Sequence, residues 1–191
     1  MADSVEIEGK VYETWLCASK DFKQRGETKA ALDNYYYVNK EMEETRYDFC
    51  VKNGWKKYID MMLIVDYLIL NRDRHGANVE VLRDARRHII RIAPLFDHGL
   101  SLLCSCYTED EVNRFEILED KPCQNFIGSR STYENLAFVE NKKDIFSNRL
   151  KMEDKESLMK DLELALSKEH MDKIWNMLWA RWCEYEKLCD L

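Results

Sequence analysis

The chain has 191 residues and a formal net charge of −7, which suit a single domain that offers no overall basic surface to a nucleic acid. Six Gly and two Pro amount to about a third of average usage, so the composition disfavours turn-rich β-sandwiches and favours helices. The seven Cys are an odd number without a paired Cys-x-x-Cys arrangement, and the longest apolar run, 61–70, is too short to span a bilayer. We therefore expect a cytoplasmic protein with reduced thiols that binds neither a membrane nor nucleic acid directly.

The first half of the chain predicts one strand, two helices and a hairpin. Residues 11–17 have the composition of a strand, and the apolar residues over 27–40 recur at helical spacing. The clearest pattern covers 55–70, where apolar residues occupy almost all faces and indicate a buried central helix. The β-branched stretches 78–82 and 88–92 flank a polar connection and predict a short hairpin.

The second half predicts a long connection followed by helices. Residues 101–130 are irregular and acidic in their middle, which is typical of a long loop. Helices are expected over 133–139, 152–166 and 168–188, the first of them capped by Ser131 or Thr132. The expected fold is mainly α with one or two small β-hairpins.

Three polar residues follow the buried helix and the hairpin at spacings that kinases use. Asp73 stands five residues before Asn78, and Asp97, which begins an Asp-x-Gly motif, stands 24 residues after Asp73. In a kinase the first Asp accepts the proton of the substrate hydroxyl, and the Asn and the second Asp hold magnesium against the phosphates of ATP. The alternative is that Asp73 and Asn78 merely cap helix and turn ends.

The sequences around these residues, DYLILNRDRHGAN over 66–78 and APLFDHGLSL over 93–102, resemble the C-terminal lobe of HipA-like serine/threonine kinases. The Asp-Arg-His-x-x-Asn core is also shared with phosphoinositide kinases, so the motif specifies phosphotransfer better than it specifies the acceptor. The resemblance implies Asp73 as the catalytic base and Asn78 and Asp97 as magnesium ligands that bind the ATP complex. It implies for His75 either a contact to the transferred phosphate or a structural role in the loop.

The sequence departs from a complete kinase before the central helix. None of its six glycines lies in a Gly-rich loop, and no Lys there has the motif context of the strand Lys that pairs with nucleotide phosphates. We therefore expect one domain over 1–191, in which 1–45 is a hinge or a residual N-terminal segment and 46–191 is a helical catalytic lobe. The N-terminal lobe with its Gly-rich loop is expected to be absent.

Three functions are consistent with these motifs. The first is transfer of phosphate from ATP, with Mg²⁺, to a Ser or Thr of a protein, with activity that depends on an N-terminal-lobe or antitoxin-like partner. The second is a non-catalytic, truncated lobe that binds nucleotide or another protein, because the Gly-rich loop and the Lys are missing. The third is phosphorylation of a lipid.

Two further groups of polar residues have alternative explanations. The serine- and threonine-rich stretch 129–133 lies where a kinase activation segment would end, so it either accepts phosphate or caps a helix. Arg83, Arg86, Arg87 and Arg91 form a basic turn in an acidic protein. Most such groups are simply solvated, and the alternative is a docking point for an acidic partner.

Overall fold

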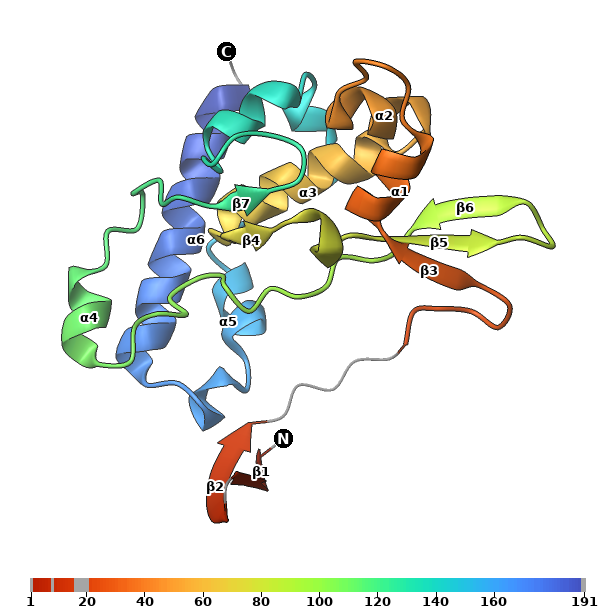
Figure 1. The fold of residues 1–191 in the computed structure, drawn as a ribbon. Coiled ribbons are helices and arrows are strands. Elements are labelled where there is room, and N and C mark those ends of the chain that lie inside the picture. Colours follow the sequence, from red (N-terminus) through yellow and green to blue (C-terminus); the bar gives the residue numbers. More distant parts are fainter. Residues whose placement is uncertain (1, 8, 16–20, 190–191) are drawn as a thin grey trace.

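The computed structural model describes residues 2–7, 9–15 and 21–189, and its elements are labelled in Figure 1. The strands are β1 (Ala2–Ile7), β2 (Lys10–Trp15), β3 (Thr28–Ala31), β4 (Asp73–Arg74), β5 (Glu80–Asp84), β6 (Ile89–Ile92) and β7 (Gln124–Asn125). The α-helices are α1 (Leu32–Asn39), α2 (Arg46–Lys52), α3 (Lys56–Leu68), α4 (Glu109–Arg114), α5 (Asp154–Met159) and α6 (Lys168–Cys189). Short 3-10 helices cover 76–78, 134–138, 142–144 and 162–164. The prediction of a mainly helical fold with small sheets is confirmed.

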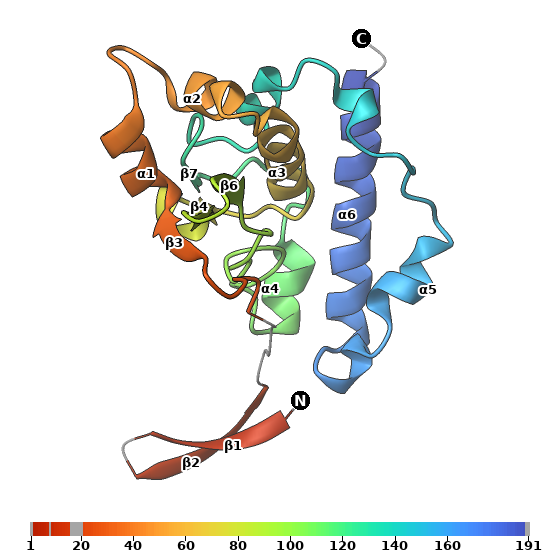
Figure 2. The ribbon, with the colours of Figure 1, turned by 90° about the vertical axis from the view of Figure 1, so that its right-hand side faces the viewer.

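Two long helices carry most of the core. Helix α3 is the predicted central helix, and Ile59, Met62 and Ile64 on it are fully buried. Helix α6 confirms the predicted C-terminal helix, and it packs Trp182 and Tyr185 against the same core. Figure 2 shows α6 running along one side of the body with α5 outside it. None of the helices in the described part of the chain is both long and apolar enough to cross a membrane.

A three-stranded antiparallel sheet in the order β3-β5-β6 lies beside the helices (Figure 1). Strands β5 and β6 form the predicted hairpin, with Val81 opposite Ile92. The helix predicted over 27–40 is wrong in its first part, because 28–31 form β3 and pair with β5. Hydrogen bonds to a strand some 50 residues away override the local helical spacing there. The helix proper starts at Leu32, which is fully buried.

The loop predicted over 101–130 contains two elements that its composition did not reveal. Helix α4 is held by a capping box, in which the Thr108 side chain accepts from the backbone of Glu111 and the Glu111 carboxylate accepts from the backbone of Thr108. Strand β7 is a two-residue parallel bridge to β4. Val112 of α4 is buried in a cluster with Ile174 and Met177 of α6, so the segment is held to the body by α4 as well as by β7.

The two shorter helices predicted in the last third also differ from expectation. The first is a 3-10 helix over 134–138, and Ser131, one of the two predicted caps, accepts from the backbone N–H of Glu134 at 2.8 Å. The helix predicted over 152–166 ends as α5 at 159, because Asp161 has a positive φ of 65° that an α-helix cannot contain. Thr132 is 1% exposed, so it cannot accept phosphate without local unfolding.

The N-terminal strands β1 and β2 form an antiparallel hairpin that stands apart from the body in both views (Figures 1 and 2). The predicted strand over 11–17 is confirmed as far as 15, and 16 and 17 lie outside the described residues. At the start of the body, the Arg91 guanidinium donates to both carboxylate oxygens of Glu27 at 2.8 Å and to the Phe22 carbonyl at 3.1 Å. Arg91 therefore joins β6 to the segment over 22–27 and is not simply a solvated arginine.

Candidate functional site

The buried carboxylate of Asp66 fixes the start of the predicted catalytic loop, 71–78. Asp66 lies in the last turn of α3 and is 1% exposed. Its Oδ1 accepts from the Asn71 amide at 2.9 Å, and Asn71 Oδ1 in turn accepts from the backbone N–H of Asp73 at 3.3 Å. The chain therefore leaves the rigid helix with its first polar residues already positioned.

The guanidinium of Arg74, which has no exposed surface, connects three segments of the site. Its Nε and Nη2 donate to the Asp66 carboxylate at 3.0 Å. Its Nη1 donates to two carbonyl oxygens, that of Asn78 at 3.2 Å and that of Phe96 at 2.7 Å. Burial raises the pKa of the Asp66 carboxyl, and the Arg74 cation opposes this shift.

His98 adds a fourth partner to the same guanidinium. Its Nδ1 lies 3.0 Å from Arg74 Nη2, and because an arginine can only donate, this Nδ1 must be the unprotonated nitrogen. Burial and the Arg74 charge lower the pKa of His98 below its ordinary value of 6.5. The contact therefore belongs to the neutral imidazole.

Three of the four predicted site residues lie in one loop and contact one another. The Asn78 amide nitrogen donates to the Asp73 carbonyl at 2.8 Å, and its Oδ1 has no hydrogen-bond partner among the residues that the structure describes. His75 Nδ1 accepts from the backbone N–H of Ala77 at 3.2 Å, and its Nε2 lies 3.5 Å from Asp73 Oδ1. The ring of His75 is therefore oriented by its own loop and faces the carboxylate of Asp73.

Asp97, the fourth predicted site residue, lies on a separate and exposed loop. It follows Phe96, whose carbonyl is bonded to Arg74, so the loop is joined to the catalytic loop through that guanidinium. Asp97 has a positive φ of 52°. Within the described part of the chain, its carboxylate has no hydrogen-bond or ion-pair partner.

The free oxygens of Asn78 and Asp97 fit a magnesium ion that takes most of its ligands from phosphates and water, as Mg²⁺ usually does. The Asn78 amide is turned so that its oxygen is available, and the Asp97 carboxylate is exposed. The described residues contain no group of three or more His, Cys, Asp or Glu that could hold a metal by itself. The donor set therefore suits a cation that arrives with a nucleotide.

Gly76 allows a close approach between the loop over 71–78 and two other segments. A Cβ at this position would lie 2.4 Å from the Cβ of Asp33 on α1 and 2.8 Å from the Phe126 ring beyond β7. Phe126 also donates its backbone N–H to the Arg74 carbonyl at 2.8 Å. Only a residue without a side chain fits between these neighbours.

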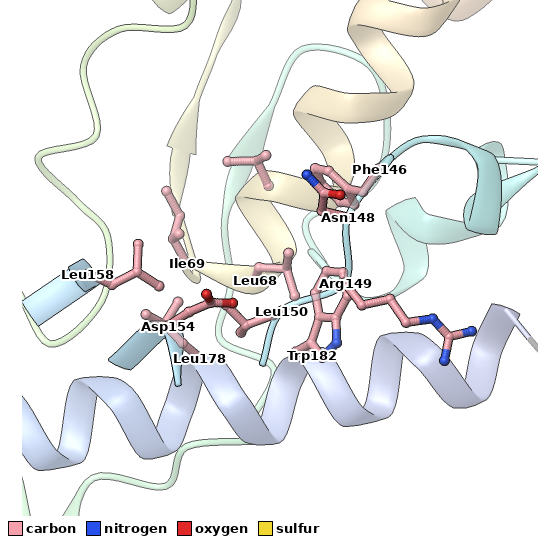
Figure 3. Close-up of a pocket in the computed structure, with 11 residues that line it drawn as sticks. Leu68, Ile69, Phe146, Asn148, Arg149, Leu150, Asp154, Leu158, Leu178 and Trp182 are labelled. Atoms are coloured by element: carbon pink, nitrogen blue, oxygen red, sulfur yellow. The ribbon is translucent and has the colours of Figure 1, made fainter. Parts of the chain in front are cut away.

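Two hollows of similar size lie in different parts of the molecule. A polar one of about 410 Å³ has His75 and Gly76 in its wall. An apolar one of about 420 Å³ lies between α3, α5 and α6, and Figure 3 shows Leu68, Leu150 and Leu178 around it. None of the predicted site residues lines the apolar hollow, so the polar hollow is the one that belongs to this site.

The sequence motifs indicate four site residues but not the group of Asp66, Arg74 and His98, in which Asp66 and Arg74 are buried and His98 is exposed. One signal was present, because Asp66 interrupts the longest apolar run, and a charge inside a buried helix requires a partner. The identity of that partner depends on the path of the chain after α3, which no local pattern contains.

The fold is similar to that of a solved kinase. The chain matches the crystal structure of a Helicobacter pylori proinflammatory kinase, CtkA, with a TM-score of 0.59 and 21% sequence identity, over 94% of this chain and 72% of that chain. The fold is kinase-like. No model of a known protein family matches the sequence, and a search of curated proteins found no match.

Proposed function

We infer that the chain is the phosphotransferase lobe of a HipA-like protein kinase, which transfers the γ-phosphoryl group of ATP to a Ser or Thr hydroxyl of a protein. Asp73 is the catalytic base, Asn78 and Asp97 are the magnesium ligands, and His75 supports the base. The kinase-like fold supports the reaction class. The choice of a protein acceptor rests on the resemblance of the motifs.

One observation carries this proposal. Arg74 Nη1 bonds to the Asn78 carbonyl and to the Phe96 carbonyl, so a single nitrogen holds the two loops that bear the proposed metal ligands. Asp73 faces His75 within the first of these loops and shares no bond with Asp97. A base that is separate from the metal ligands is what phosphoryl transfer needs, because the base must accept a proton.

In the proposed reaction the acceptor oxygen forms a bond to the γ-phosphorus while the bond from that phosphorus to the β–γ bridging oxygen breaks. The hydroxyl proton passes to the Asp73 carboxylate, and ADP leaves. A bound magnesium ion neutralises phosphate charge. The chain contributes orientation, since the Asn78 amide fixes the Asp73 carbonyl and His75 limits the movement of the Asp73 carboxylate.

Transfer of labelled phosphate from ATP to a mixture of proteins, with and without Mg²⁺, tests the proposal. We expect Mg²⁺-dependent incorporation that falls by about a hundredfold or more in Asp73→Asn. Asp48→Asn, an exposed carboxylate in α2, is the matched control. Absence of incorporation by the intact chain, alone and with a partner that supplies a Gly-rich loop, would contradict the proposal.

A second candidate is a non-catalytic module that binds nucleotide or protein. The observation that favours it is the lack of a Gly-rich loop in the sequence. Calorimetric titration with Mg-ATP separates the two, because a lobe that binds Mg-ATP through Asp97 but transfers no phosphate is a binding module. Lipid acceptors, included beside the proteins, test for transfer to a lipid.

A further inference from the structure

The polar hollow beside the catalytic loop has a charge opposite to that of the whole chain. Its wall contains two arginines, Arg46 and Arg130, and a single acidic residue, Asp33. The chain as a whole has a net charge of −7. A locally basic hollow in an acidic protein indicates a ligand with negative charge.

Neither arginine forms an ion pair with any of the residues that the structure describes. Arg46 is half-buried and donates to the Phe126 carbonyl at 3.2 Å and to the Tyr37 hydroxyl at 3.1 Å, with its Cζ 5.1 Å from the centre of the Phe126 ring. These contacts hold the guanidinium in place but leave its charge and further N–H donors available. Arg130 is exposed and forms no ion pair within the described residues.

The hollow lies beside the proposed base, Asp73. His75 lines it and lies 3.5 Å from Asp73 Oδ1. Gln124, in the same wall, pairs with Asp73 across the parallel bridge of β4 and β7. The proposed metal ligands, Asn78 and Asp97, do not line it. The hollow therefore adjoins the base and not the magnesium site.

We propose that this hollow binds an acidic side chain of the acceptor, so that the preferred substrate is a Ser or Thr with an Asp or Glu two residues away. The inference rests on the proposed function, because it places the acceptor hydroxyl at Asp73. In an extended peptide, residues two apart lie on the same side at about 7 Å, so the acceptor hydroxyl can face the base while the side chain two residues away faces the adjoining hollow. Arg46 and Arg130 pair with the carboxylate, and Arg46 is positioned for it before binding.

Binding without ATP tests the inference separately from catalysis. The probe is a fluorescent peptide with one serine and a glutamate two residues away on each side, compared with the same peptide carrying glutamines at those positions, by fluorescence anisotropy at low salt. We expect the acidic peptide to bind at least about tenfold more tightly, and Arg130→Gln to remove most of that difference. Arg46→Lys keeps the positive charge and the fold but loses the paired N–H donors of the guanidinium. It is expected to weaken binding by less than Arg130→Gln does.

The matched control is Arg86→Gln, which removes the same charge from the exposed turn of the β5–β6 hairpin and should leave binding unchanged. Equal weakening by Arg86→Gln, equal binding of both peptides, or loss of Mg-ATP affinity in Arg130→Gln would each overturn the inference. A chain that binds the acidic peptide selectively yet transfers no phosphate would overturn the proposed function and retain the binding site. A chain that phosphorylates both peptides equally would overturn the binding site and retain the proposed function.

Discussion

The two loops that bear the proposed site residues are held very differently. In the loop over 71–78, Arg74 is fully buried, Asn78 is 7% exposed, and both are bonded within the core. In the loop over 94–100, Asp97 is exposed and its carboxylate has no partner among the described residues. The proposed base, Asp73, is therefore preorganised by the fold, whereas the position of the Asp97 carboxylate is left to what binds it.

The largest expected effect comes from removing the charge that unites the two loops. Arg74→Met leaves the Asp66 carboxylate buried without its cation, which should lower the free energy of unfolding by about 3–5 kcal/mol. Urea denaturation followed by tryptophan fluorescence measures it. Arg72→Met, a half-buried neighbour, is the control, and equal losses in the two variants would show that Arg74 does not unite the two loops.

A smaller loss of stability is expected when a glycine of the loop over 71–78 is replaced, and little or none when a glycine of the exposed loop is replaced. Gly76→Ala forces a Cβ to within 2.4 Å of Asp33, and overpacking of this kind costs about 1–3 kcal/mol. Gly99→Ala, in the exposed loop, brings a Cβ no closer than 3.5 Å to Asp97 and should be tolerated. Denaturation of both variants measures the contrast, which a stable Gly76→Ala would refute.

The contact between His98 and Arg74 should make stability depend on pH. The folded state lowers the pKa of His98, so the unfolded chain takes up the proton first as pH falls below about 6.5. Stability due to this contact is therefore complete above that pH and decreases as pH falls. Thermal unfolding from pH 7.5 to pH 5 measures it, with His98→Asn as the control. An unchanged pH dependence in that variant would contradict the prediction.

The smallest effect on stability is expected at Asp97, although its effect on activity should be large. Because the Asp97 carboxylate has no partner in the described structure, Asp97→Asn should change the free energy of unfolding by less than about 0.5 kcal/mol. Mg²⁺-dependent phosphotransfer should fall by about a hundredfold or more. Marked destabilisation would mean that the exposed loop is also held by the fold.

Elements with a local signal could be predicted from the sequence. The apolar periodicity of α3 and α6 and the β-branched strands of the hairpin needed no information from elsewhere in the chain. Strand β3 and the β7 bridge form because of distant partners, and composition does not encode such pairing. The break at Asp161 depends on a single positive φ.

The residues of the candidate site likewise divide into those that local spacing predicts and those that only the folded chain brings together. Spacing alone placed Asp73 and Asn78 in one loop, because five residues cannot carry them far apart. Their connection to Asp97 depends on the Phe96 carbonyl reaching Arg74, a contact across 22 residues that spacing does not determine. The arginines of the polar hollow come from α2 and from the segment after β7, so only the folded chain brings them together.

The hydrogen bonds of Arg91 to Glu27 and Phe22 also determine where the N-terminal segment joins the body. Arg91 holds the Phe22 carbonyl, and the Phe22 ring lies 5.8 Å from that of Phe96, the residue before Asp97. The β1–β2 hairpin is thus tethered at the less constrained side of the site. Because the hairpin and Asp97 belong to one chain, the concentration of the hairpin near Asp97 is set by the length of chain between the two and not by diffusion of a separate molecule.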